Sequence, residues 1–155
     1  MVDAAPVFAR RLWPQQLAVG VKGAAPLLVH WARTILELHP SWVLFKIDFR
    51  NAFNTVERAA LLRAIRDDPL LCHWYPTFYA WISKAADCRV GFGKVSAWFR
   101  SEQGGQQGDG LVMAAFCRAL HPHLVACDVA MGVDGELRAP GDSFKYMQDL
   151  MVLLP

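Results

Sequence analysis

Two acidic residues far apart in the sequence, Asp48 and Asp149, have the strongest potential for chemistry. Asp48 lies at the end of the apolar run WVLFKIDF, and Asp149 lies inside the largely apolar stretch FKYMQDLMVLL. A carboxylate at the end of a buried strand points toward the space above a sheet, where it can hold Mg²⁺ with oxygen ligands. The main-chain carbonyl of Phe49 is a further oxygen donor beside it. Because a buried carboxylate is costly unless it is paired, Asp149 is either a surface residue or part of a site.

A polar loop, GGQQGDG at residues 104–110, precedes an expected helix. Exposed backbone N–H groups and a helix N-terminus suit the phosphates of a nucleotide. Gln107 can form hydrogen bonds, and Gly108 permits a close approach of the backbone. Taken singly, such a loop, a strand-end Asp and an Asp in a turn are common surface features. Their occurrence together, in this order, is far more specific.

Hydrophobic periodicity predicts the elements that position these residues. The run at residues 42–49 is short, continuous and rich in aromatic and β-branched residues, which predicts a buried strand. The order of elements predicts an α+β fold, with helices covering one face of a mostly antiparallel sheet. We expect an irregular segment at 1–22, helices at 23–38, 57–66 (with Thr55 as N-cap) and 111–127, a helical stretch after Pro69 that is interrupted at Pro76, paired strands within 89–100, and a final strand or hairpin at 144–154 with a turn at 146–149.

Composition sets limits on the class of protein. The chain has 155 residues, of which 54% are hydrophobic and 19% charged, so disorder is not expected. A net charge of +2 does not by itself indicate a nucleic-acid partner. The longest apolar segment, 111–127, is interrupted by polar residues and Pro122, so no membrane span is expected. Four cysteines without a CxxC pair, and an N-terminus unlike a secretory signal, predict a reduced, intracellular protein.

Three motifs in one order resemble the palm region of a reverse transcriptase, an RNA-directed DNA polymerase. Their sequences are most similar to those of the enzymes that non-LTR retrotransposons encode. Asp48 with Ala52-Phe53 resembles the first palm motif, and Gln107-Gly108 resembles the second. Tyr146-Met147-Gln148-Asp149 resembles the tyrosine–x–aspartate–aspartate motif, which is the third. The segment QLAVGVKGAAPLLVHWAR also resembles the sequence that precedes the palm in these elements.

The resemblance spans roughly residues 16–154 and implies a domain organisation. It implies that residues 1–22 are the remnant of a fingers-side segment and that 23–155 form a partial palm domain. The expected architecture is therefore a palm-like antiparallel sheet with helices on one face, incomplete fingers and no thumb. The oligomeric state is left open.

The resemblance also implies a two-metal nucleotidyl transfer site. In this family Mg²⁺ ions activate the primer 3′-hydroxyl and stabilise the leaving pyrophosphate. Asp48 and Asp149 would be the catalytic carboxylates, and both would bind metal together with the carbonyl of Phe49. The implied partners are an RNA template, a DNA primer and deoxynucleoside triphosphates.

Four further residues receive roles from the same resemblance. Phe53 matches the aromatic residue that excludes a 2′-hydroxyl, which implies a preference for deoxynucleotides. Gln107 would contact the incoming nucleotide, and Gly108 would leave room for it. Tyr146 would face the primer end and the template.

Gln148 departs from the family pattern because it replaces the first aspartate of the third motif with a neutral amide. Two unit charges ~4 Å apart interact by ~4 kcal/mol at an effective dielectric of ~20. Losing that much transition-state stabilisation slows a reaction about a thousandfold. The sequence therefore predicts a reverse transcriptase fragment that is inactive as it stands. A catalytically silent nucleic-acid-binding domain, an inert α+β domain and an interaction domain with accidental motifs stay open as alternatives.

Overall fold

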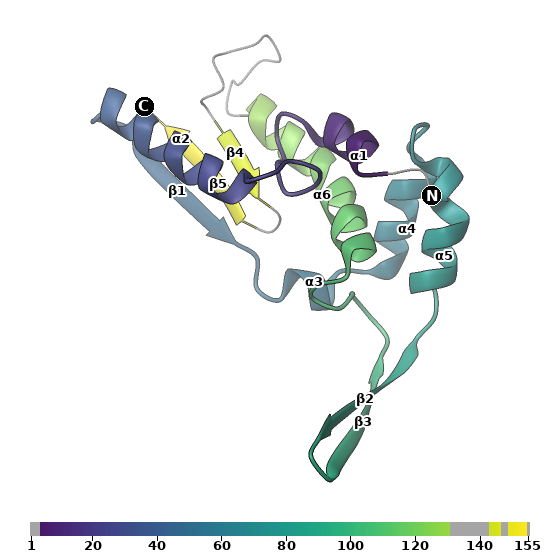
Figure 1. The fold of residues 1–155 in the computed structure, drawn as a ribbon. Helices are drawn as coiled ribbons and strands as arrows, with labels where there is room; N and C mark the ends of the chain where they lie inside the picture. Colours follow the sequence, from purple (N-terminus) through teal and green to yellow (C-terminus); the bar gives the residue numbers. More distant parts are fainter. Residues whose placement is uncertain (1–3, 131–142, 147–148, 155) are drawn as a thin grey trace. The chain divides into compact units, whose positions relative to one another are not determined.

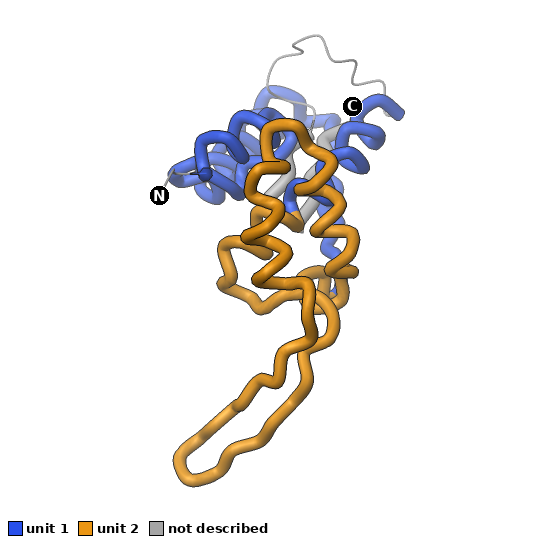
Figure 2. Tube along the Cα trace, turned by 90° about the vertical axis from the view of Figure 1, so that its right-hand side faces the viewer, with its two compact units in different colours: residues 1–50, 117–155 blue, residues 51–116 orange. Residues whose placement is uncertain are grey.

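The computed structural model describes residues 4–130, 143–146 and 149–154 (Figure 1). Helices and antiparallel strands both contribute to the described part, so the predicted α+β class is confirmed. The chain divides into two compact units (Figure 2). Unit 1 comprises residues 1–50 and 117–155, and unit 2 comprises residues 51–116. The expected domain boundary after residue 22 rests on the resemblance and stays a prediction.

Unit 1 is built around a three-stranded sheet of order β1-β5-β4. Both strand pairs are antiparallel, as expected. Helix α2 contacts β1 and β4 (Figure 1), so a helix lies against this sheet. The elements of unit 1 are α1 (Ala5–Leu12), α2 (Ala24–Leu38), β1 (Val43–Asp48), β4 (Ser143–Tyr146), β5 (Asp149–Leu154) and the later turns of α6 (Gly110–Ala130).

Apolar residues of α2 and of the segment before it form a small core in unit 1. Leu17, Ala24 and Leu28 are buried together, with Val21 and Trp31 packed against them. The sequence predicted an irregular N-terminal segment, and this prediction is wrong. Helix α1 forms there and buries Phe8 and Leu12. The apolar spacing of those residues outweighs the helix-breaking tendency of Pro6, which lies in the first turn where proline is tolerated.

Strand β1 forms where predicted, but the prediction that it is buried is wrong. Val43, Phe45 and Ile47 are 52%, 52% and 47% exposed. A continuous apolar run predicts cover on both faces of a sheet. β1 is an edge strand with β5 as its one partner, and no described residue buries this alternating row of side chains. Burial is therefore decided by what packs on the strand and not by its composition.

Unit 2 combines a helical core with a projecting hairpin (Figure 2). Leu61, Ile65 and Phe78 are among its fully buried side chains. The predicted hairpin is confirmed, with β2 and β3 antiparallel around a turn in which Gly93 has φ +61°. The elements of unit 2 are α3 (Ala52–Thr55), α4 (Arg58–Arg66), the 3₁₀ helix η1 (Cys72–Trp74), α5 (Tyr75–Ile82), β2 (Ala86–Phe92), β3 (Val95–Ser101) and the first turns of α6.

Two local predictions in unit 2 have different outcomes, the N-cap being wrong and the interruption at Pro76 being confirmed. Thr55 is not an N-cap, since its hydroxyl donates to the Asn51 carbonyl (2.9 Å) within α3, and Glu57 precedes α4 instead. The helical stretch after Pro69 is interrupted next to Pro76, as predicted, because η1 ends at Trp74 and a separate helix, α5, begins at Tyr75. Pro76 lies in the first turn of α5. There its missing N–H group leaves no helix hydrogen bond unmade.

Helix α6 is long and apolar enough to cross a membrane by length and composition alone. Buried core helices of water-soluble proteins pass the same test. Its described side chains include the buried Val112, Ala115 and Leu124, and Pro122 lies inside it. The expected absence of a membrane partner stays a prediction.

Candidate functional site

The ends of three strands bring the two predicted catalytic acids to opposite positions in the sheet of unit 1. Asp48 is the last residue of β1, and Asp149 is the first residue of β5. These two residues are Cα partners across the antiparallel pair. Asp149 is also the Cα partner of Tyr146, the last residue of β4. Asp48, Asp149 and Tyr146 therefore form one row across the sheet at the backbone level.

Antiparallel geometry explains why residues so distant in sequence meet. β4 and β5 are antiparallel neighbours, and β5 also pairs with β1 in the antiparallel sense. Residues 147 and 148 lie outside the described residues, and Gln148 is one of them. Directly opposed residues of an antiparallel pair have Cα atoms about 4.5–5.5 Å apart.

The oxygen donors of this row match the chemistry that Mg²⁺ takes. Asp48 is exposed, and Phe49, whose carbonyl is the third predicted ligand, is 39% exposed. Carboxylate and carbonyl oxygens are hard donors of the kind that Mg²⁺ prefers. Among the residues that the structure describes, no three His, Cys, Asp or Glu side chains gather as a metal-binding group. The donors thus fit the ion by type, with two carboxylates from the row.

The three predicted nucleotide-contacting residues all belong to unit 2. Phe53 lies on α3, is 9% exposed and packs its ring on Phe116 with centroids 4.8 Å apart. Gln107 and Gly108 are exposed in the loop that joins β3 to α6. Gly108 has φ +91°, and a Cβ there would meet no atom within 4 Å, so both its conformation and the space around it suit a glycine beside a ligand.

The sequence did not reveal how closely this loop is fastened to α3. The amide of Gly105 donates to the Phe53 carbonyl (2.8 Å), and the amide of Gly104 donates to the Val56 carbonyl (2.9 Å). Gly104 has φ +62°, and main-chain atoms of Phe53 and Asn54 occupy the place where a Cβ would be. The adjacent glycines at 104 and 105 were the one signal of this approach. Only glycine permits both the conformation and the contact.

Asp109 changes the expectation for the start of α6. Its Oδ1 accepts from the amides of Leu111 (2.9 Å) and Val112 (3.3 Å), and its Oδ2 accepts from the indole of Trp81 (2.6 Å). The carboxylate thereby satisfies backbone donors that otherwise attract an anion at a helix N-terminus. We expected this terminus to suit phosphates, but the chain's own carboxylate occupies it.

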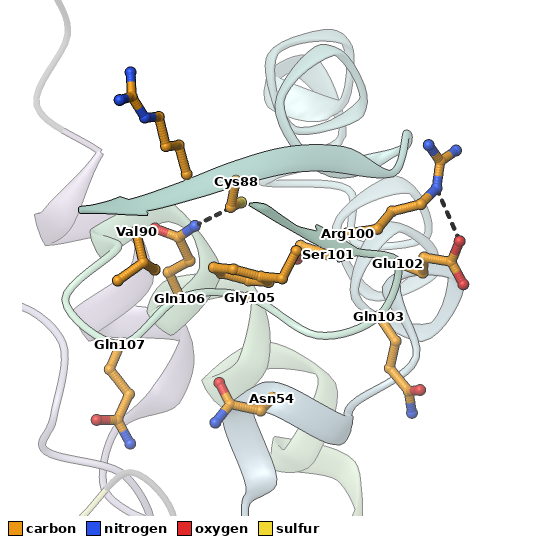
Figure 3. A pocket seen from close by; sticks show the side chains of 12 residues that line it. Asn54, Cys88, Val90, Arg100, Ser101, Glu102, Gln103, Gly105, Gln106 and Gln107 are labelled. Atoms are coloured by element: carbon orange, nitrogen blue, oxygen red, sulfur yellow. Dashed lines mark hydrogen bonds and ion pairs between the residues drawn. The ribbon is translucent and has the colours of Figure 1, made fainter. Parts of the chain in front are cut away.

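A pocket of about 810 Å³ lies between the hairpin and the loop of unit 2 (Figure 3). Gln106 points toward the hairpin and donates to Cys88 Sγ (3.4 Å), whereas Gln107 points away from it (Figure 3). The Nε of Arg100 forms an ion pair with Oε1 of Glu102, at a distance of 2.9 Å. Amide and charged side chains share the polar lining, which comprises Asn54, Arg89, Arg100, Ser101, Glu102, Gln103, Gln106 and Gln107.

The hairpin itself exposes aromatic and basic side chains. The register puts Arg89 opposite Trp98, and the Arg89 guanidinium lies 6.0 Å from the centroid of the Trp98 ring. Trp98 is 68% exposed and Phe92, next to the turn, is 90% exposed. Sequence reasoning places Trp98 in a core, because tryptophan is highly buried on average, so its exposure is a finding of the structure.

The structure thus places the predicted residues in two separate groups. Unit 1 holds Asp48, Phe49, Tyr146 and Asp149, and unit 2 holds Phe53, Gln107 and Gly108. No protein-family model matches the chain, and no curated protein matches it. The resemblance to reverse transcriptases stays a prediction, which rests on the motifs alone.

Proposed function

We propose that this chain is a reverse transcriptase palm by origin, with a two-metal nucleotidyl transfer site. The site binds metal too weakly to support DNA synthesis as it stands. The observation that carries the proposal is the backbone pairing of Asp48 with Asp149. Two acids brought together from distant parts of a chain are what a shared metal site requires. An accidental Asp in each motif has no reason to share a register position.

The residues that would hold Mg²⁺ are Asp48, Asp149 and the carbonyl of Phe49. When bound, the metal supplies charge neutralisation and a polarised primer hydroxyl. Tyr146, the neighbour of Asp149 in the row, would face the primer end and the template, as the resemblance implies. The chain's own contribution is to bring the two acids to one register position at the ends of β1 and β5.

Gln148 is the reason for proposing an inactive enzyme. A neutral amide oxygen in place of a carboxylate removes about 4 kcal/mol of charge interaction at a separation of ~4 Å and a dielectric of ~20. The corresponding loss in rate is about a thousandfold. Metal occupancy falls in the same direction, because fewer anionic ligands face the ion.

In unit 2, the proposal assigns the incoming deoxynucleotide to Gln107, Gly108 and Phe53. Gln107 and Gly108 are exposed, which leaves them accessible to a ligand. Phe53 packs on Phe116 and is 9% exposed, so the core fixes its ring and leaves only a small part of it open to a ligand. A ring held in this way can exclude a 2′-hydroxyl by contact.

Two measurements test this function. We expect the purified chain to show no extension of a DNA primer on an RNA template with Mg²⁺, and clear incorporation would refute the proposed inactivity. In calorimetric titrations, Gln148→Asp should bind Mg²⁺ at least about tenfold more tightly than wild type, a difference of ~1.4 kcal/mol. Adding Asp48→Asn to that variant should abolish the gain. An unchanged gain would refute the shared metal site.

A second candidate function, a catalytically silent nucleic-acid-binding module, is favoured by the hairpin. Exposed aromatic rings next to basic groups suit stacked bases and phosphates, and each stacked base contributes ~1–3 kcal/mol. Trp98→Ala should therefore weaken binding of a single-stranded oligonucleotide about fivefold or more in the absence of Mg²⁺. Trp13→Ala, a change at another exposed tryptophan, is the matched control. Equal effects of the two changes would exclude a role for the hairpin.

A further inference from the structure

Arg58, at the start of α4, makes four hydrogen bonds to segments that are distant in sequence. Its Nε donates to the carbonyl of Gly104 (2.8 Å). Its Nη2 donates to the carbonyl (3.1 Å) and the hydroxyl (2.8 Å) of Ser101, and its Nη1 donates to the carbonyl of Lys84 (2.6 Å). One partly buried guanidinium thus joins the end of β3, the following loop and the segment that leads into β2.

No local pattern in the sequence indicates this role of Arg58. Arg58 shares its helix with Arg63 and Arg66, and a run of arginines on one helix predicts a solvated face. Arg66 fits that expectation, since it pairs with its exposed neighbour Asp67. Arg58 differs because all its described partners are at least 26 residues away in sequence.

The hydrogen bonds of Arg58 belong to a larger attachment between the loop and α3. The amides of Gly104 and Gly105 donate to the carbonyls of Val56 and Phe53, and the side chain of Gln103 donates to the carbonyl of Thr55 (2.8 Å). The loop is held again at its other end, where Asp109 caps α6. Gln107 and Gly108 lie between these two anchors.

We infer that Arg58 is a positioning residue, which fixes the loop bearing Gln107 and Gly108 against the helix bearing Phe53. This inference rests on the proposed function, because it assigns Arg58 to discrimination between deoxynucleotides and ribonucleotides. Discrimination requires that Phe53, which would exclude the 2′-hydroxyl, keeps a fixed position relative to Gln107 and Gly108, which would contact the nucleotide. The planar fork of arginine suits this task, since its five N–H donors have fixed directions.

Four single variants test the role. Arg58→Met keeps most of the side-chain stem and removes every donor, while Arg58→Lys keeps the charge and loses the fork. Ser101→Ala removes one acceptor and leaves the arginine in place. Arg66→Met is the matched control on the same helix.

The first readout is amide hydrogen exchange, which needs no nucleotide. Losing a hydrogen bond to a charged group should raise exchange at Gly104 and Gly105 by about 10- to 100-fold in both Arg58 variants. Ser101→Ala should raise it about 2- to 10-fold, which keeps the test valid where the Arg58 variants do not fold. Arg66→Met should leave it unchanged. Wild-type exchange in Arg58→Met, or an equal rise throughout α4, would overturn the inference.

The second readout is the ratio of affinities for dATP and ATP in the presence of Mg²⁺. A positioning role predicts that the preference for dATP falls toward one in both Arg58 variants, a change that simple loss of stability does not produce. An unchanged ratio alongside raised loop exchange would overturn the link to nucleotide choice. If the wild-type chain binds neither nucleotide, the proposed function fails, and the exchange experiment still supports or overturns the attachment by Arg58.

Discussion

Replacing Gly104 with alanine tests how tightly the loop of unit 2 is attached to α3. Gly104 has φ +62°, and an added Cβ would collide with main-chain atoms of Phe53 and Asn54. An alanine in the left-handed conformation costs about 1–2 kcal/mol. Moving the loop away also weakens the bonds from Gly104 and Gly105 to the helix, at about 1 kcal/mol each. Together these terms predict a loss of about 3–4 kcal/mol in the stability of unit 2.

Gly93→Ala is the matched control for this experiment. Gly93 has nearly the same φ, +61°, but no atom lies within 4 Å of the position of an added Cβ. It should therefore lose about 1–2 kcal/mol from backbone strain alone. The remaining difference of about 2 kcal/mol isolates the close contact at Gly104 from the strain that both positions share.

Native-state hydrogen exchange with mass spectrometry measures both variants, because it reports opening free energies for peptides of each unit separately. Peptides that cover α3 and α4 should show the loss in Gly104→Ala and only the smaller loss in Gly93→Ala. Equal losses in the two variants would refute the reasoning, since they would mean that the loop yields without breaking its attachment.

Three further predictions concern single side chains. Asp109→Ala should destabilise unit 2 by about 1–2 kcal/mol in urea unfolding, because the N-terminus of α6 loses its cap. The control, Asp67→Ala, should have no measurable effect. Equal effects of the two changes would contradict the capping role. Burial raises the pKa of the Cys117 thiol to about 12. A thiol reagent at pH 8 should therefore modify the exposed Cys72 and Cys127 in the folded chain and leave Cys117 unmodified. Labelling of all three thiols at one rate would contradict the burial of Cys117. Because the unfolded thiol ionises near its ordinary pKa of 9.0 and the folded one does not, the stability contributed by Cys117 is present below pH 9 and is lost as pH rises toward 12. A pH series of urea midpoints should therefore show a decline above pH 9 that Cys117→Ala reduces.

Hydrophobic periodicity predicted most elements near their observed positions. The helix expected at 23–38 is α2 (Ala24–Leu38), and the strand expected at 42–49 is β1 (Val43–Asp48). Such elements are set by local patterns of spacing, which the sequence contains in full. Periodicity did not predict α1, which is only eight residues long. The Pro and Gly residues in and around this segment indicated a loop, although its apolar residues lie on one helical face.

The candidate site was predictable in its residue types and not in its supporting contacts. The motifs indicated two acids, and the pairing of β1 with β5 agrees with their expected proximity along the sheet. Nothing local distinguished Arg58 from other arginines, or the Gly104 position from an ordinary loop glycine. Their roles depend on carbonyl groups that are remote in sequence.

The sequence by itself determined the residue types that could bind a metal and a nucleotide, the neutral amide at Gln148 and the order of helices and strands, because these depend on side-chain chemistry and on spacing between near neighbours. Only the tertiary structure decided that Asp48 and Asp149 share a register position, that Asp109 occupies the N-terminus of α6 and that an arginine joins three segments of unit 2. Strand pairing and long-range hydrogen bonds arise when segments distant in the chain pack together, so no local pattern of residues specifies them.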